Sequence, residues 1–375
     1  MPVAKSSKQL IGTGANKTLA YLLSDDFCFK AKKAGRVAKI DTKNNLAILM
    51  YDDGTKDAID LDDKLSKNSN MGFYIHQKFK LVYKENEHFD EGDVIAYNPD
   101  YFTGKGKDVD YKPGVLAKVA IASGDFSFED STFVSEKLCE KCAGKINMLS
   151  QTVLGKNAVI HKIVDKGDKV QTGDSLIEFT TSFDDEDTNL FLQKLSSALS
   201  DEQVQELTYE KKVAKYAGEI TKVEILYNCP ETELSESLQK LIKKIRGRLA
   251  DRSKAVEGIR SNVHIQPLEQ VSDKKNNKAE FPEDGGVIIN IWVEYIDTLG
   301  MGDKITFMTA LKGVVSRIAS DSISPLCDYR PEDEIEAICT PSGIIGRMTG
   351  DIYFTLYGNK VLVELGKQIR EIWNK

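Results

Sequence analysis

The sequence predicts a mixed α+β fold in which β-strands predominate. Residues 27–61 alternate β-prone segments with turn residues, and residues 287–293 form a longer, apolar β-prone run. Residues 230–252 instead repeat apolar side chains at helical spacing, with basic residues on the other face. We therefore expect several sheets and one long amphipathic helix. A chain of 375 residues has room for two or three domains.

Residues 1–85 are predicted to form a β-rich segment. Gly35-Arg-Val-Ala-Lys-Ile-Asp41 and Leu46-Ala-Ile-Leu-Met-Tyr51 have the composition of strands. Asp52-Asp53-Gly54 follows the second of them and has the composition of a hairpin turn. The Asp52-Asp53 pair also resembles aspartates with which some polymerases hold magnesium. We favour the turn, because Asp-Gly between alternating strands is a strong hairpin signature.

Residues 86–150 combine strands with a pair of carboxylates. Gly92-Asp93 opens one strand, and Pro113-Gly114 leads into another. Glu129-Asp130 then follows aromatic residues and precedes a helix expected to begin near Ser135. Two adjacent carboxylates commonly cap a helix, and they can also help to order a metal-bound phosphate. The residue types leave both roles open.

Residues 151–284 are predicted to form paired strands, a polar helical insert over roughly 187–216, a returning strand from Ala217, and the long helix. We expect Pro230 in the first turn of that helix, where a missing N–H costs nothing. The basic face includes Lys243, Lys244 and Arg246. A solvated face is the favoured interpretation, and contact with a nucleic-acid backbone is the alternative.

Residues 285–350 place three cations near glycine-rich turns. Lys304 and Lys312 lie inside an otherwise apolar segment, where lysines seldom occur without an anion to meet. Arg347 comes from a second glycine-punctuated stretch, so folding could gather all three cations at one phosphate-binding site. The alternative is that both lysines are solvated and Arg347 pairs with a carboxylate. In the last segment, 351–375, residues 361–373 could form either a short strand or a helix.

Composition restricts the functional classes. The net charge of −7 and the pI of about 5.4 argue against nucleic-acid binding by the whole surface, although a local basic groove remains possible. The N-terminus lacks the apolar core of a signal peptide and no stretch is apolar enough to span a bilayer, so we expect a cytoplasmic protein. Cys139 and Cys142 have zinc-ligand spacing but lack a second pair, and we expect no zinc.

Five motifs occur in the order found in one protein family. Leu10-Ile-Gly-Thr-Gly14 resembles Leu-Val-Gly-Thr-Gly, and Gly92-Asp-Val-Ile-Ala96 resembles Gly-Asp-Val-Leu-Ala. Phe128-Glu-Asp-Ser131 is similar to Phe-Glu-Asp-Ser, and it again precedes Val-Ser-Glu. Gly302-Asp-Lys to Lys-Gly313 resembles Gly-Asp-Lys…Asn-Lys-Gly, and Pro341 to Met348 resembles Pro-Leu-Gly-Val-Pro-Ser-Arg-Met. The family is the C-terminal half of the beta (second-largest) subunit of multisubunit DNA-dependent RNA polymerases.

The chain departs from the family between its motifs. Phe307 to Leu311 replaces Gly-Arg-His-Gly-Asn between the lysines, and Ile345-Gly346 replaces Pro-Ser before Arg347. It resembles a divergent, split form such as those of large (jumbo) bacteriophages. The resemblance begins after the family's fork-loop residues and ends before its C-terminal clamp segment. Either other polypeptides supply both, or the sequence is a fragment of a longer chain. Localisation would then be the host cytoplasm or a phage nucleus compartment.

The resemblance implies an architecture. Residues 86–150 and 285–350 would form the two parts of a double-psi β-barrel, with 1–85 packed on it and 351–375 as a C-terminal segment. Residues 151–284 would be a flap-like β-sandwich inserted with the long helix. In the family the flap lies by the RNA exit path and receives a promoter-specificity factor.

The resemblance also assigns roles to individual residues. Lys304 and Lys312 match lysines that contact the RNA 3′ end and nucleotide phosphates, and Arg347 matches an arginine on the nucleoside triphosphate. Glu129 and Asp130 match the pair near the second Mg²⁺ ion. The catalytic Mg²⁺ is held in the family by an aspartate loop of the largest (beta prime) subunit, and that loop is absent from this sequence. Alone, the chain is therefore expected to be inactive.

The expected partners are an N-terminal beta polypeptide, beta prime polypeptides, template DNA, RNA and NTPs, without a membrane. Two other functions remain open. The chain could be a degenerate, non-catalytic barrel that acts as an assembly or DNA-binding scaffold. It could also be a carrier-domain enzyme, which would have a covalently attached cofactor.

Overall fold

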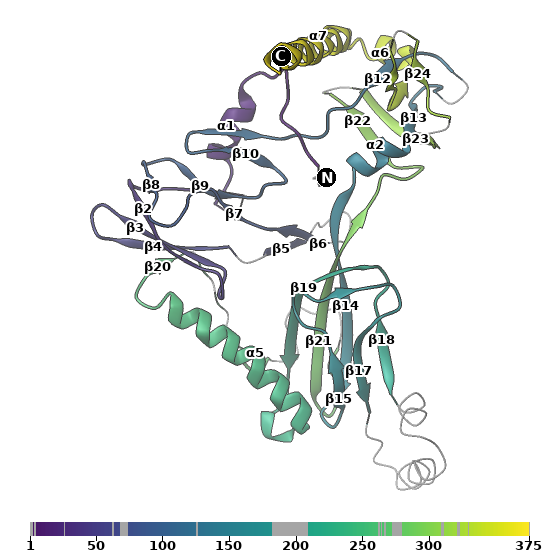
Figure 1. Ribbon diagram of the computed structural model, residues 1–375. Helices are drawn as coiled ribbons and strands as arrows, with labels where there is room; N and C mark the ends of the chain where they lie inside the picture. The colour runs from purple at the N-terminus through teal and green to yellow at the C-terminus, as the bar shows by residue number, and fades with distance from the viewer. Residues whose placement is uncertain are drawn as a thin grey trace.

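The computed structural model describes residues 3, 5–25, 27–61, 64–67, 74–124, 127–181, 209–261, 263, 265, 268–271, 280–308, 311–320, 323–328 and 330–374. It confirms a strand-rich, mixed α+β chain with curled sheets. Figure 1 shows an N-terminal group of sheets, a β-sandwich and a third curled sheet, with long strands joining the last two.

The N-terminal group contains a five-stranded sheet in the order β20-β4-β3-β2-β8. Its strands are β2 (Gly35–Asp41), β3 (Leu46–Tyr51), β4 (Lys56–Asp60), β8 (His88–Phe89) and β20 (Arg260–Ser261). β3 and β4 pair as neighbours, and Gly54 adopts the left-handed backbone with a φ of 80°. The hairpin predicted at Asp52-Asp53-Gly54 is therefore confirmed.

Smaller elements pack beside this sheet around Ala20, Val94 and Phe102. They are α1 (Ala15–Leu22), β1 (Cys28–Lys30), β7 (Lys80–Leu81), β9 (Val94–Tyr97), β10 (Phe102–Lys105) and β11 (Asp108–Tyr111). The motif at 10–14 ends where α1 begins, and Gly14 has a φ of 85°, a conformation that favours glycine.

The β-sandwich is built on three long antiparallel strands, β14 (Gly144–Gly155), β19 (Gly218–Tyr227) and β21 (Gly286–Asp297). Their sheet has the order β16-β19-β21-β14-β6-β5, in which the short strands are β5 (Lys64–Lys67), β6 (Tyr74–Gln77) and β16 (Lys169–Val170). A second sheet contains β15 (Val159–Ile163), β17 (Ser175–Thr180) and β18 (Glu210–Val213). The predicted returning strand after Ala217 is β19.

The predicted helical insert over 187–216 is corrected where it is described. Residues 187–208 lie outside the described residues, but Glu210–Val213 is the strand β18, paired with β17. These residues form a strand because their backbone N–H and C=O groups hydrogen-bond to β17, which contains the buried Ile177. Their local composition does not reveal this pairing.

The long helix, α5 (Glu236–Ala255), covers one side of the sandwich (Figure 1). Leu238 and Ile242 are fully buried against the strands of the sandwich core. The predicted start at Pro230 is wrong: a short 3₁₀ turn, η1 (Glu231–Glu233), follows Pro230, and α5 begins only at Glu236. The Ser235 hydroxyl accepts a hydrogen bond from the Leu238 N–H, and this cap determines where the helix starts.

The third sheet combines strands from two distant parts of the chain in the order β12-β26-β13-β23-β22. The strands are β12 (Val119–Ile121), β13 (Ser131–Ser135), β22 (Lys304–Phe307), β23 (Leu311–Ala319) and β26 (Ala337–Cys339). β13 is parallel to β23 but antiparallel to β26. The inner face of this sheet buries Val134, Val315 and Ala337 with the helix α2 (Glu136–Lys141).

Three further elements complete the C-terminal part of the chain. They are the hairpin of β24 (Leu326–Cys327) and β25 (Arg330–Glu334), the short helix α6 (Pro341–Gly346) and the long helix α7 (Asp351–Trp373). The structure resolves the open choice for the last segment in favour of a helix. Of the helices in the described part of the chain, none has the length and apolar character needed to cross a bilayer.

Candidate functional site

The two lysines lie on one β-hairpin. β22 and β23 pair antiparallel, with Lys304 opposite Val314 and Thr306 opposite Lys312. Residues opposite each other share a face, so both ammonium groups project from the outer face of the hairpin, where Lys304 and Lys312 are exposed. Phe307, Leu311 and Val315 occupy the inner face and are buried. The Cβ atoms of diagonal neighbours in such a hairpin are about 7–8 Å apart, a spacing that lets two cations contact one polyphosphate.

A recurrent turn positions Lys304. In the turn 300–303, the Gly300 N–H donates to the Asp303 carboxylate over 2.8 Å, and Gly302 has a φ of 88°. The same arrangement occurs before β9, β16 and β17, where the aspartates are Asp93, Asp168 and Asp174. Each strand begins at the residue that follows the aspartate. The Gly-Asp part of the motif is thus a turn that starts a strand. It places Lys304 as the first residue of β22.

Gly313 lets the hairpin approach the Glu129-Asp130 segment. The Val314 N–H donates to the Asp130 carbonyl over 2.8 Å. A Cβ atom on Gly313 would lie 2.0 Å from Thr132 Oγ1 and 3.1 Å from the Asp130 carbonyl oxygen. Real Cβ atoms do not come this close to a neighbour, so only glycine fits between Lys312 and the start of β13.

We expect Gly313→Ala to lower the free energy of unfolding by about 1–3 kcal/mol, because the added methyl group overpacks this contact. Thr132→Ala in the same chain should recover part of the loss, since it removes the closest atom. Gly346→Ala is the control, because no atom lies within 4 Å of its Cβ position. Urea unfolding gives the free energy of unfolding of wild type, Gly313→Ala, the Gly313→Ala/Thr132→Ala double variant and Gly346→Ala. Equal stability of Gly313→Ala and Gly346→Ala would contradict the close approach.

Arg347 reaches the same segment from the other side. α6 starts with Thr340 as its N-cap and Pro341 in its first turn, and Arg347 is its C-cap residue. The Arg347 guanidinium contacts the Asp130 carboxylate over 2.6 Å and the Gly343 carbonyl over 3.3 Å. This ion pair is the alternative that the sequence left open for Arg347. Both side chains remain partly accessible, at 36% and 55%.

Glu129 lies in the turn before β13 and does not cap a helix. Its backbone is left-handed, with a φ of 51°, and the Ser131 N–H donates to the Phe128 carbonyl within this turn. α2 is capped by Ser135 instead. The helix-cap role left open for Glu129 and Asp130 is therefore wrong, because β13 separates them from α2. The exposed Glu129 carboxylate shares the segment of the Asp130–Arg347 pair.

Three separate segments therefore meet at one end of the third sheet. Asp130 contacts Arg347 directly, and the hairpin with both lysines is joined to Asp130 through Val314. Lys304 stands on the edge strand, one strand further out than Lys312. Residues of these types suit phosphate oxygens and the cations that phosphates carry.

The residues present could supply part of the ligand set of a Mg²⁺ ion, but not the whole set. Mg²⁺ is commonly bound by one or two carboxylates together with waters and substrate phosphates. Glu129 could supply one such carboxylate, whereas Asp130 already contacts Arg347. Within the described ranges, no group of three or more His, Cys, Asp or Glu side chains is arranged to hold a metal. A second source of ligands would be required.

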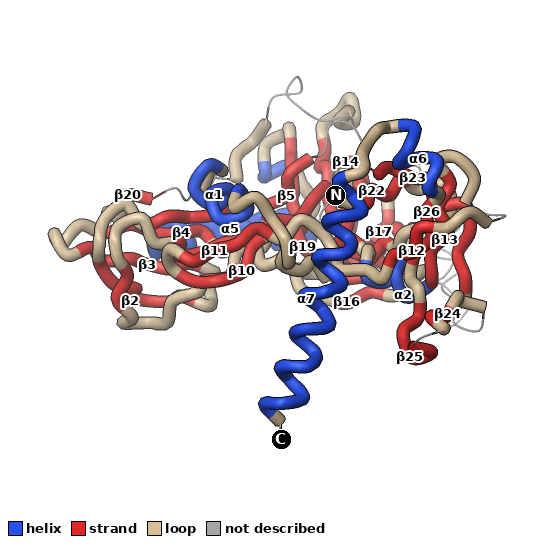
Figure 2. Tube along the Cα trace, turned by 90° about the horizontal axis from the view of Figure 1, so that it is seen from above, coloured by secondary structure: helices blue, strands red, loops and turns tan. Residues whose placement is uncertain are grey.

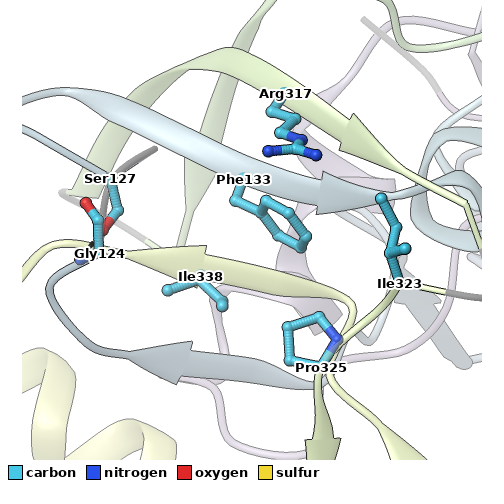
Figure 3. A pocket seen from close by; sticks show the side chains of 7 residues that line it. All are labelled: Gly124, Ser127, Phe133, Arg317, Ile323, Pro325 and Ile338. Carbon is cyan, nitrogen blue, oxygen red and sulfur yellow. Dashed lines mark hydrogen bonds between the residues drawn. The ribbon is translucent and has the colours of Figure 1, made fainter.

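A hollow of about 290 Å³ lies further along the same outer face. Phe133 sits opposite both Arg317 and Ile338 on neighbouring strands, and Ile323 and Pro325 close one side (Figure 3). Ser131 and Phe133 project from the same face of β13, so this hollow and Lys312 share that face. This hollow is not predictable from the sequence, because Ile323 and Pro325, which close it, belong to no motif.

The basic face of α5 is largely engaged by carboxylates. Lys244 and Arg248 contact Asp165, with Lys244 at 2.7 Å, and Arg246 pairs with Glu231. Arg252 pairs with Asp60 of the N-terminal sheet. The predicted role of Lys243, Lys244 and Arg246 in nucleic-acid binding stays a prediction. Through these contacts α5 connects the sandwich to the N-terminal sheet (Figure 1).

The ion pairs between α5 and Asp165 should weaken in acid. The hydrogen bond from Arg248 holds the pKa of Asp165 well below its usual value. Because the folded-state pKa is lower than the unfolded value of about 4, its stabilisation is present above that value and is lost as pH falls through the folded-state pKa. We expect Asp165→Asn to be less stable than wild type at neutral pH, with the difference shrinking below about pH 4. Denaturant unfolding at several pH values checks this, and a constant difference would contradict it.

The paired cysteines have the environment of core residues. Cys139 is buried within α2, and burial raises the pKa of Cys142 to about 11. The bulk of both side chains is used in packing the third sheet.

Comparison with known proteins adds no assignment. No protein-family model matches the chain. No curated protein matches its sequence either.

Proposed function

We propose that this chain is a subunit of a multisubunit DNA-dependent RNA polymerase and corresponds to the C-terminal half of the beta subunit. Its part in nucleotidyl transfer is to bind the nucleoside triphosphate, the RNA 3′ end and the RNA–DNA hybrid. The third sheet would then belong to a double-psi β-barrel, and the sandwich with α5 would be the flap. Mg²⁺ would be held mainly by a companion beta prime polypeptide.

One observation carries the proposal: Asp130 contacts Arg347 although 217 positions separate them, and its carbonyl binds Val314, two residues after Lys312. Three of the five motifs that resemble the polymerase family thereby meet at one end of one sheet. Motif order in a sequence does not require such a meeting. The convergence therefore supports the proposal independently of the order.

The chemistry of phosphoryl transfer fits these residues. The reaction is catalysed mostly by positioning and by neutralising charge on the transferred group. Lys304 and Lys312 can bind phosphate oxygens as mobile point charges, whereas Arg347 offers a planar fork that binds two oxygens together. The proposal requires the Arg347 guanidinium to divide its donors between Asp130 and the triphosphate. Its partly exposed position at the end of α6 leaves space for that.

The test has two stages. Purification of the full chain from its natural source should bring down a companion that carries the missing aspartate loop. The complex reconstituted from these polypeptides should extend RNA on a DNA template. Lys312→Ala should slow extension by at least about 100-fold without loss of assembly, because an exposed cation on a formed hairpin adds little to stability.

Lys162→Ala is the matched control, because Lys162 is an exposed strand lysine on β15 in the sandwich. Extension by Lys162→Ala should equal wild type. Normal extension by Lys312→Ala in a fully assembled complex would remove the catalytic role, and it would favour a non-catalytic barrel that serves as a scaffold. A covalently attached cofactor found by mass spectrometry would instead favour a carrier domain.

A further inference from the structure

The helix α7 has two opposed apolar faces. Ile352 is buried and Leu356 packs against the core of the third sheet, so one face belongs to the body of the chain. On the other side, exposed large apolar side chains follow one another at helical spacing from 354 to 373. We call this surface the α7 stripe; it comprises Phe354, Tyr357, Val361, Leu365, Ile369, Ile372 and Trp373. Phe354 and Trp373 are 82% and 86% exposed.

The second half of α7 lies away from the rest of the chain. Figure 2 shows it extending beyond the body toward the C-terminus, with no other described segment alongside. From Gln368 to Asn374 every residue is exposed. The first half, in contrast, rests on the body, and the Ile11 side chain packs at Gly358. An apolar helix of which only half is supported calls for a surface from outside the chain.

The exposed area is large enough for a stable interface. An aromatic side chain buries about 150–250 Å² when it is covered. Phe354, Tyr357 and Trp373 are each about three-quarters or more exposed, so they alone offer about 500 Å². The aliphatic members of the stripe add to this. A standard interface buries about 800 Å² on each partner, and one α7 stripe together with the residues that flank it can reach that area.

The charges beside the stripe indicate which surface covers it. Lys360, Glu364, Lys367 and Glu371 follow one another along one edge at spacings of four, three and four residues. The charges along this edge are positive, negative, positive and negative. Read in the opposite direction they are negative, positive, negative and positive, so two antiparallel copies place opposite charges side by side. Within one helix, Glu364 pairs with Lys360 at 3.0 Å and with Lys367 at 3.4 Å. In an antiparallel pair of α7 helices, these side chains also come next to opposite charges, Lys360 near Glu371 of the second copy and Glu364 near Lys367. In a parallel pair this edge would lie beside the opposite edge of the second helix, so its charges would not face one another.

The same register joins the apolar residues. Leu365 lies next to the two-fold axis and meets Leu365 of the second copy. Val361 then lies beside Ile369 of the second copy, and Trp373 lies beside its Tyr357. The projecting second half of each α7 is thus covered by the supported first half of the other. A two-fold axis requires this kind of self-complementary patch.

We propose that α7 is a homodimerisation helix, which pairs antiparallel with α7 of a second copy of this chain about an axis near Leu365. The pairing uses none of the cations at the end of the third sheet. Its success or failure is therefore independent of the polymerase assignment. It explains why a helix with no cover over its second half keeps apolar residues there.

Light scattering of the full chain after gel filtration, over a range of concentrations, tests the proposal. Wild type should have twice the mass of the 41.8 kDa chain and dissociate on dilution. Leu365→Glu should weaken dimerisation by roughly 100-fold, because it places two carboxylates at the axis. Its circular dichroism should match wild type, since Leu365 is already half exposed. The control Lys162→Glu should remain a dimer.

Two further variants examine the register. Glu364→Lys and Lys367→Glu should each weaken the dimer, because each places like charges opposite one another. The two together should restore it, since the 364–367 pairs are then exchanged and the Lys360–Glu371 pairs are unchanged. Leu365→Cys should form a disulfide-linked dimer under mild oxidation, whereas Arg370→Cys, on the other side of the helix, should not. A monomeric wild type at every concentration would overturn the proposal. So would a monomer whose α7 stripe is needed to copurify a different polypeptide.

Discussion

Replacing Arg347 by alanine is expected to lower RNA extension by the reconstituted complex about 100- to 1000-fold. Removal of one charge-stabilising donor in an enzyme commonly has an effect of this size. The Arg347 guanidinium contacts the Asp130 carboxylate over 2.6 Å. Steady-state extension with varied NTP concentration measures the loss.

Two comparisons separate contact with the nucleotide from a purely structural role. Arg347→Lys keeps the charge but loses the planar fork, so it should recover only a small part of the activity. Asp130→Asn removes the ion pair and leaves Arg347 in place. If Arg347 serves only to hold Asp130, then Arg347→Ala and Asp130→Asn should be equally slow. The nucleotide role predicts that Arg347→Ala is clearly the slower of the two.

The stability of the chain should change little in these variants. The Arg347–Asp130 pair is partly exposed on both sides, and exposed ion pairs contribute about 0–1 kcal/mol. Urea unfolding of the purified variants checks this. A large loss of stability in Arg347→Ala would mean that the drop in extension reflects folding, and the catalytic interpretation would then fail.

The largest effect on stability is expected from Leu238→Ala in α5, a loss of about 2–5 kcal/mol in the free energy of unfolding. Leu238 is fully buried between α5 and the long strands of the sandwich, so the truncation leaves a cavity there. Denaturant unfolding monitored by circular dichroism measures the change.

Lys240→Ala, two residues away on the exposed side of α5, is the control. Lys240 is exposed and forms an i,i+4 ion pair with the exposed Glu236, so the change should stay within about 0.5 kcal/mol. If Leu238→Ala and Lys240→Ala had equal stability, α5 would not be packed on the sandwich as described.

Local sequence was sufficient for elements whose signals lie within a few residues. The Asp52-Asp53-Gly54 hairpin was predictable because Asp-Gly adopts the turn that two flanking strands need. The buried face of α5 was predictable because Leu238 and Ile242 belong to a repeat at helical spacing. The start of α5 was not, since Ser235 and Pro230 are competing local signals and the Ser235 cap prevailed.

Strand β18 and helix α7 show the limits of local pattern. Glu210–Val213 is polar and reads as helix, but pairing with β17 makes it a strand. The final segment has apolar residues on two sides, so its composition suits a strand as well as a helix. In both cases the deciding contacts come from residues distant in the sequence.

The sequence by itself determined which side chains are available for chemistry: two lysines at fixed spacing, an arginine after α6 and a pair of carboxylates. Only the tertiary structure decided that they meet. Asp130 and Arg347 are 217 positions apart, and no periodicity relates two residues at that separation. Their contact depends on β13 pairing with β26, which leads into α6. The lysine hairpin approaches Asp130 because β13 also pairs with β23 and Gly313 leaves space. The physical reason is that side-chain identity is local, whereas proximity results from strand pairing and close packing over the whole sheet.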